Sequence, residues 1–234
     1  MRLLVLLLAL VIWAAPWQAQ AQAETRIQCR TALVLALDVS SSVDEDEYAL
    51  QTQGLAAAFT DAEVIDLILA SPGSGIMVSA YEWSGVWQQN LIVPWTWLGD
   101  EAAIYAFAAR LSGYTRDVES WPTAIGRATE FGANLLRRAP GNCWRHVIDV
   151  SGDGINNDGV GPDWYRRRGD FDGMIINALV IRGEEPDPLE YYQRHVIHGP
   201  GAFIEIADGY EDFHRAIRRK LIRELQPGMQ VSRR

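Results

Sequence analysis

The chain has 234 residues, of which 48% are hydrophobic and 22% are charged, so it can form one sizeable domain with its own core. The formal net charge at pH 7 is −9, and basic residues cluster only near the C-terminus, which makes the chain a poor candidate for binding nucleic acid. The sequence contains no repeats and no low-complexity tracts, which argues against a solenoid or a disordered array.

The first 23 residues have the composition of a signal peptide. A positive charge precedes an apolar run over residues 3–15, which is shorter than the roughly 20 residues that a membrane-spanning helix needs. An Ala-Gln-Ala sequence that ends at Ala23 then offers small side chains for cleavage. We therefore expect a signal peptide over 1–23, a secreted domain without a stable membrane span over 24–228, and a short tail over 229–234.

Each of the two cysteines precedes an apolar run that leads to an aspartate. Cys29 lies nine residues before Asp38, and Cys143 lies ten residues before Asp153. If the two runs are neighbouring parallel strands, both cysteines lie at the same end of the sheet, at a separation that a disulfide can bridge. Because secretion brings the chain into an oxidising compartment, we predict a disulfide between Cys29 and Cys143 rather than two buried thiols.

Short apolar runs alternate along the chain with longer segments of helical spacing. The apolar runs, which we expect to be buried strands, cover residues 32–37, 76–81, 146–150, 174–181 and 202–206. The predicted helices lie between them, over roughly 45–70, 101–111, 124–138, 187–195 and 209–225. Such alternation predicts an α/β fold: a doubly wound, mostly parallel sheet with helices on both faces.

One segment interrupts this alternation. Residues 76–95 form two strand-like halves joined through Ser84-Gly85, and Pro94 lies in the second half. Proline cannot donate a backbone hydrogen bond and is therefore tolerated mainly in edge strands. We expect a hairpin whose second strand is an antiparallel edge of the sheet.

The first predicted strand ends in a carboxylate that is followed by hydroxyl groups. Asp38, Ser40 and Ser42 occupy alternate positions of one loop, where their side chains can converge. In doubly wound sheets, ligands bind beyond the carboxyl ends of the strands, near the point where strand order reverses. A hard cation such as Mg²⁺ prefers oxygen ligands and keeps some water, so this loop is a candidate metal site.

Two further segments could complete the ligand set. Asp153 follows the predicted strand over 146–150 and lies between two glycines, which allow close approach. Thr123 lies at the start of the helix that precedes this strand. Three segments at consistent topological positions are stronger evidence for a site than any one of them.

A helix cap is the competing explanation for these polar residues. Serine and aspartate are favoured N-caps, and Glu45 lies three residues after Ser42, as in a capping box. Thr123 alone could likewise be a cap. Both roles can coexist in one loop, and we expect the acidic run over 44–47 to be the solvated first turn of a helix.

The sequence D-V-S-S-S at residues 38–42 resembles the D-x-S-x-S signature of von Willebrand factor A domains. Thr123 and Asp153 fall where that family has its later metal-site threonine and aspartate, and the resemblance covers about residues 30–226. The chain is most similar to secreted bacterial A-domain-like proteins of unknown function, which implies the bacterial periplasm. The resemblance implies a metal-ion-dependent adhesion site for Mg²⁺ or Mn²⁺, completed by an acidic residue of a partner.

Two tryptophans are candidates for the rim of a partner-binding surface. Trp83 precedes the predicted hairpin turn, and Trp121 lies beside Thr123. Packing in the core is the commoner role of a tryptophan, whereas an exposed aromatic side chain can anchor an interface. We predict Trp83 and Trp121 as the rim.

These observations favour a binding module over an enzyme. We expect a secreted receptor for a protein partner that presents Asp or Glu, through Mg²⁺ or Mn²⁺ held by Asp38, Ser40, Ser42, Thr123 and Asp153. The alternative is a metal-dependent, phosphatase-like hydrolase with Asp38 as nucleophile. That chemistry usually needs a second acidic group near the nucleophile and a positioned Lys or Arg, whereas the first lysine of the chain is Lys220.

Overall fold

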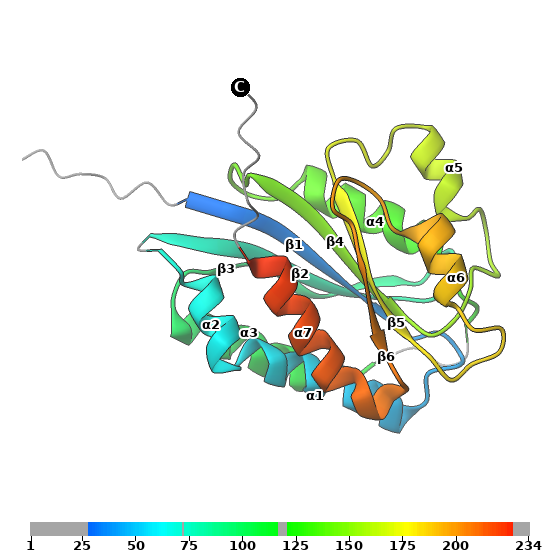
Figure 1. Cartoon of the computed structure of the whole chain (residues 1–234), viewed down its shortest axis with the longest axis horizontal. Coiled ribbons are helices and arrows are strands. Elements are labelled where there is room, and N and C mark those ends of the chain that lie inside the picture. The colour runs from blue at the N-terminus through cyan, green and yellow to red at the C-terminus, as the bar shows by residue number, and fades with distance from the viewer. Residues whose placement is uncertain (1–27, 72, 117–120, 227–234) are drawn as a thin grey trace, which may run out of the picture.

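The computed structural model describes residues 28–71, 73–116 and 121–226, and its strands form a six-stranded sheet in the order β3-β2-β1-β4-β5-β6 (Figure 1). The strands are β1 Gln28–Asp38, β2 Ser74–Trp83, β3 Gln89–Leu98, β4 Arg145–Gly152, β5 Ile175–Ile181 and β6 Ile204–Ala207. Neighbouring strands are parallel except β2 and β3, so the predicted doubly wound sheet with one antiparallel edge strand is confirmed. Strand order reverses between β1 and β4.

Helices cover both faces of this sheet, as predicted (Figure 1). One face carries α1 Glu45–Phe59, α2 Ala62–Ile68, α3 Glu101–Ser112 and α7 Phe213–Leu225. The other face carries α4 Ile125–Arg137, α5 Pro162–Arg167, α6 Leu189–Tyr191 and the π-helix Tyr192–Val196 that continues α6. Successive side chains of β1 point to opposite faces, so Leu33 packs in the core on the α1 side and Val34 packs in the core on the α4 side.

The helices of the structure differ from the predicted ones in four places, one of which is the predicted helix over 187–195, found as the short α6 followed by the π-helix. The predicted helix over 45–70 is two helices, because Asp61 accepts a hydrogen bond from the backbone N–H of Glu63 and starts α2. Helix α5 was not predicted, since its six residues are too few to show a helical period. The predicted helix over 209–225 begins with a short 3₁₀ turn, Tyr210–Asp212, that leads into α7.

The predicted disulfide between Cys29 and Cys143 is present. Cys29 lies near the start of β1 and Cys143 lies just before β4, at the same end of the sheet. The backbone N–H of Trp144 donates to the backbone oxygen of Cys29 at 3.2 Å, which extends the contact beside the bridge. The predicted signal peptide over 1–23 and the predicted tail over 229–234 lie outside the described residues, and no helix within the described ranges is long and apolar enough to cross a membrane.

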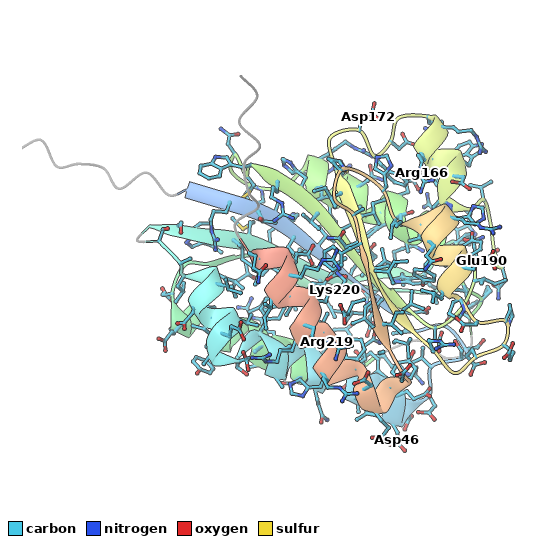
Figure 2. The ribbon with its side chains drawn as sticks, in the orientation of Figure 1. Asp46, Arg166, Asp172, Glu190, Arg219 and Lys220 are labelled. Atoms are coloured by element: carbon cyan, nitrogen blue, oxygen red, sulfur yellow. A yellow bond between two sulfur atoms is a disulfide. The ribbon has the colours of Figure 1, made fainter. Side chains whose placement is uncertain are left out.

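A buried charge cluster connects α7 to the centre of the sheet. Lys220, which Figure 2 labels on α7, is fully buried and forms ion pairs with Asp149 of β4 and Glu224 of its own helix. Asn177 of β5 donates to the Glu224 carboxylate at 2.7 Å. Burial raises the pKa of Asp149 to about 7, although the positive charge of Lys220 acts in the opposite direction. The cluster therefore holds one cation between two carboxyl groups that are both removed from water.

Removing the disulfide should lower the free energy of unfolding by about 4–5 kcal/mol, because the bridge closes a loop of more than a hundred residues. The double variant Cys29→Ala/Cys143→Ala can be compared with the oxidised wild type by urea denaturation. Equal stability of the two proteins would show that the bridge does not constrain the unfolded chain.

The variant Lys220→Met should lower the free energy of unfolding by about 3–5 kcal/mol, since it leaves Asp149 and Glu224 buried without their cation. The loss should become smaller as the pH falls toward about 7 and should level off below it, because a protonated Asp149 needs no cation. The matched control is Arg219→Met on the same helix, which removes a partly exposed ion pair with Glu205 of β6 and should cost less than about 1 kcal/mol. Equal losses in the two variants, measured by urea denaturation, would contradict this prediction.

Candidate metal centre

The two predicted aspartates meet at the point where strand order reverses. Asp38 is the last residue of β1, and Asp153 directly follows β4, which pairs with β1 in parallel. Leu37 and Ser151 are register partners, so the two strands end side by side. Both aspartate side chains are buried. This is the position at which open α/β sheets bind ligands.

Hydrogen bonds connect the serine-rich loop to the end of β4. The Ser42 hydroxyl donates to Oδ1 of Asp153 at 2.8 Å, across 111 residues of sequence. The hydroxyl oxygens of Ser40 and Ser42 lie 3.3 Å apart, and the backbone N–H of Ser40 donates to Oδ1 of Asp38 at 2.8 Å. Four of the five predicted ligands therefore belong to one hydrogen-bonded group of residues.

Thr123 lies next to this group. A methyl group built on Gly154 would lie 3.5 Å from Oγ1 of Thr123, so the threonine hydroxyl lies against the residue that follows Asp153. The loop after β4 also holds the threonine backbone, since Asn157 accepts from the Thr123 N–H at 2.8 Å and donates to its carbonyl oxygen at 2.9 Å. Asp158 accepts from the backbone of Val86 at 2.9 Å, which is a loop contact rather than a contact of the site.

The capping explanation for the serine and threonine side chains is wrong. The N-cap of α1 is Asp44, which forms a capping box with Glu47 two residues later than the sequence suggests. The N-cap of α4 is Ala124, which makes no side-chain cap. The acidic residues over 44–47 do form the first turn of α1, as predicted. The hydroxyl groups of Ser42 and Thr123 therefore do not cap the start of a helix.

The electrostatics of the site disfavour two ionised aspartates. Burial raises the pKa of Asp38 well above its usual value, and the neighbouring charge of Asp153 raises it further. Burial also raises the pKa of Asp153, to which the charge of Glu184 contributes. Among the described residues neither carboxylate forms an ion pair, and Oδ2 of Asp38 has no hydrogen-bond partner. A buried carboxylate oxygen without a partner is costly unless a cation or another donor reaches it.

The donor set fits Mg²⁺ or Mn²⁺. It consists of two carboxylates and three neutral hydroxyl groups, all oxygen ligands of the kind that hard cations prefer. In the described ranges no group of three or more His, Cys, Asp or Glu side chains is arranged to hold a metal ion. A cation bound here would therefore depend on the hydroxyl groups and on water for most of its ligands.

The prediction that Trp83 belongs to a surface rim is wrong. Its side chain is 0% exposed, because β2 lies inside the sheet and Trp83 packs in the core on the α4 side. Trp121 is 42% exposed, and its backbone oxygen accepts from the N–H of Ser41 at 2.9 Å, so it lies beside the serine-rich loop. Trp87, in the hairpin turn, is 83% exposed.

Sequence reasoning missed two tyrosines. The hydroxyl of Tyr210 donates to Oδ2 of Asp153 at 3.2 Å, and Tyr192 lies close to Asp38. Tyr210 follows β6 at the carboxyl edge of the sheet, so its topological position was a usable signal. Tyr192 begins a π-helix, for which the sequence holds no comparable signal.

Comparison with known families gives a match over most of the chain. The family model described as "Protein of unknown function (DUF1194)" matches residues 28–229. No curated protein sequence matches the chain.

Solved structures with the same fold share little sequence with this chain. A "von Willebrand factor type A" protein from Catenulispora acidiphila has a TM-score of 0.60 at 15% identity, over 85% of this chain and 43% of that one. Proximal thread matrix protein 1 of the mussel byssus, "with zinc occupied MIDAS motif", has a TM-score of 0.60 at 14% identity, over 83% and 48%.

The pilus adhesin SpaC from Lactobacillus rhamnosus GG has a TM-score of 0.61 at 13% identity, over 86% of this chain and 31% of that one. The chain spans less than half the length of each of these three proteins. At such low sequence identity, the structural similarity establishes the fold alone. The match to the family model establishes the family to which the chain belongs. The chain belongs to the DUF1194 family and has the fold of a von Willebrand A domain.

Proposed function

We propose that the protein is a metal-dependent binding module that engages an acidic side chain of a protein partner. The ion, Mg²⁺ or Mn²⁺, would be held by side chains of the serine-rich loop, the start of α4 and the end of β4: Asp38, Ser40, Ser42, Thr123 and Asp153. The observation that carries the proposal is the Asp38 carboxylate, which is fully buried at the reversal of strand order and has an Oδ2 without a hydrogen-bond partner in the described chain.

The composition of the site favours recognition of an anion. Only two of the five side chains are anionic, so a bound divalent ion would remain open to a carboxylate supplied by a partner. Trp121, exposed beside the serine-rich loop, is the residue of this chain that we propose for the partner-binding rim. The mussel protein with a zinc-occupied site of this class and the pilus adhesin have the same fold, which supports a binding role.

The phosphatase-like alternative has less support. Lys220 is buried in the cluster with Asp149 and Glu224, where it cannot hold a phosphate. Arg116 approaches the serine-rich loop but donates to the backbone oxygen of Val43 at 2.7 Å. A positioned cation for the transferred group is therefore missing from the described part of the site.

Secretion belongs to the same proposal. The predicted signal peptide over 1–23 would direct the chain out of the cytoplasm, into the bacterial periplasm. The disulfide between Cys29 and Cys143 is compatible with an oxidising compartment.

The secreted chain should be stabilised against heat by Mg²⁺ or Mn²⁺ relative to EDTA, because an ion that binds only the folded state adds about 2.7 kcal/mol at a hundredfold excess over its dissociation constant. Asp38→Ala should abolish this rise. Asp46→Ala, which removes an exposed carboxylate of the first turn of α1, should retain it. A wild-type melting temperature that does not respond to either ion would overturn the proposed function.

In EDTA at neutral pH, Asp38→Asn should melt at a higher temperature than the wild type, because it removes a carboxyl group whose ionisation is disfavoured by burial and by the charge of Asp153. Mg²⁺ should reverse the order, since only the wild type gains from the ion. The raised pKa of Asp38 contributes stability that is present at low pH and lost as the pH rises, so the difference in EDTA should shrink on acidification. A variant that melts below the wild type in EDTA at neutral pH would contradict this account.

A further inference from the structure

Gly152, the last residue of β4, lies close to the hydroxyl of Tyr192 and to the carboxylate of Asp38. A methyl group at this position would lie 2.5 Å from the hydroxyl oxygen of Tyr192 and 2.7 Å from Oδ2 of Asp38. It would also lie 3.3 Å from Cζ2 of Trp83. Only glycine therefore fits here, and its lack of a side chain lets the phenol of Tyr192 approach the Asp38 carboxylate.

The two oxygens that meet beside Gly152 are both buried and both lack a partner. Tyr192 is fully buried, and within the described residues neither its hydroxyl nor Oδ2 of Asp38 makes a hydrogen bond. Their separation cannot exceed the sum of their distances to the built methyl position, so one water molecule could bridge them with two ordinary hydrogen bonds. Leaving a buried hydroxyl and a buried carboxylate oxygen both unpaired is destabilising for each group.

A π-helix positions Tyr192 beside Asp38. Tyr192 starts the π-helix that continues α6, and its carbonyl oxygen accepts from the N–H of Ile197, five residues later, at 3.2 Å. A π-helix is rare and is frequently found at functional sites. Its presence indicates that the position of Tyr192 is specified and not only tolerated.

The other aspartate of the site already has a tyrosine partner. The Tyr210 hydroxyl donates to Oδ2 of Asp153 at 3.2 Å, while Ser42 donates to Oδ1 of the same carboxylate. An ionised carboxylate offers about four lone-pair positions, so one oxygen can accept a phenol and still face a cation. Oδ1 of Asp38 accepts a hydrogen bond from the Ser40 N–H. The Tyr192 hydroxyl lies beside Oδ2 of Asp38 and is the donor that we consider for it.

We propose that Tyr192 is a positioning residue of the metal centre: its hydroxyl donates to Oδ2 of Asp38 across one water molecule and fixes the carboxylate for the ion. The inference rests on the proposed function of the site and adds a residue to it. Burial, together with the charges of Asp38 and Asp153, raises the pKa of Tyr192 well above its usual value, so the hydroxyl keeps its proton and remains a donor. Partners that orient metal ligands typically contribute 10–100-fold to metal affinity.

The test is calorimetric titration of the secreted chain with Mg²⁺, repeated with Mn²⁺. Tyr192→Phe should weaken binding about 10-fold or more. The matched control is Tyr81→Phe, which removes a buried hydroxyl that donates to the backbone oxygen of Ala128 on α4. This control should leave the dissociation constant unchanged. The melting temperature in EDTA should fall less in Tyr192→Phe than in the control, because the Tyr81 hydroxyl donates to a backbone oxygen whereas the Tyr192 hydroxyl makes no direct hydrogen bond to a described residue.

Each outcome decides one question. Equal affinities of wild type and Tyr192→Phe would overturn the positioning role and leave the proposed function intact. Equal weakening by Tyr192→Phe and Tyr81→Phe would also overturn it, since packing would then explain both. A wild type that binds neither ion would overturn the proposed function and this inference together.

If Tyr192→Phe fails to fold, proton NMR of the wild type replaces the titration of the variant. We expect a slowly exchanging Tyr192 hydroxyl signal that shifts on addition of Mg²⁺, and an unshifted signal overturns the proposal.

Discussion

The parallel pairing of β1 and β4 is the constraint on which the site depends. It brings the carboxyl ends of two strands that are more than a hundred residues apart in sequence to one edge of the sheet. Asp38 ends the first strand there, and Asp153 directly follows the second. Because the sheet is doubly wound outward from this pair, the edge lies where loops diverge and leave room for a ligand. The hydrogen bond from Ser42 to Asp153 is a direct product of this pairing.

Much of the architecture could be predicted from sequence because the pattern is strong. Apolar runs such as 146–150 alternate with helical segments, and Pro94 marks the edge strand. The D-x-S-x-S loop and its distant partners could be placed because strand ends share an edge in a parallel sheet. Trp83 could not, since a tryptophan at a strand end can face the core or solvent, and the sequence does not say which. Tyr192 depends on a π-helix, which leaves no periodic signal.

The protein buries carboxylates in two different ways. Asp149 lies in the middle of the sheet with Lys220 built in beside it, so its charge is compensated by the chain itself. Asp38 and Asp153 lie at the edge without any such cation among the described residues, and burial raises the pKa of both carboxyl groups. The second arrangement is the one that a bound cation would relieve.

The disulfide and the candidate metal centre lie at opposite ends of the same two strands. Cys29 and Cys143 join the amino ends of β1 and β4, and Asp38 and Asp153 follow their carboxyl ends. A partner pulling on the serine-rich loop would transmit tension lengthwise along β1. The interstrand hydrogen bonds of β1 on both sides would then be loaded together in shear instead of being peeled apart singly, and the covalent bridge would share the force at the far end. The strand that ends in the candidate site is therefore held on both sides and would resist such a load.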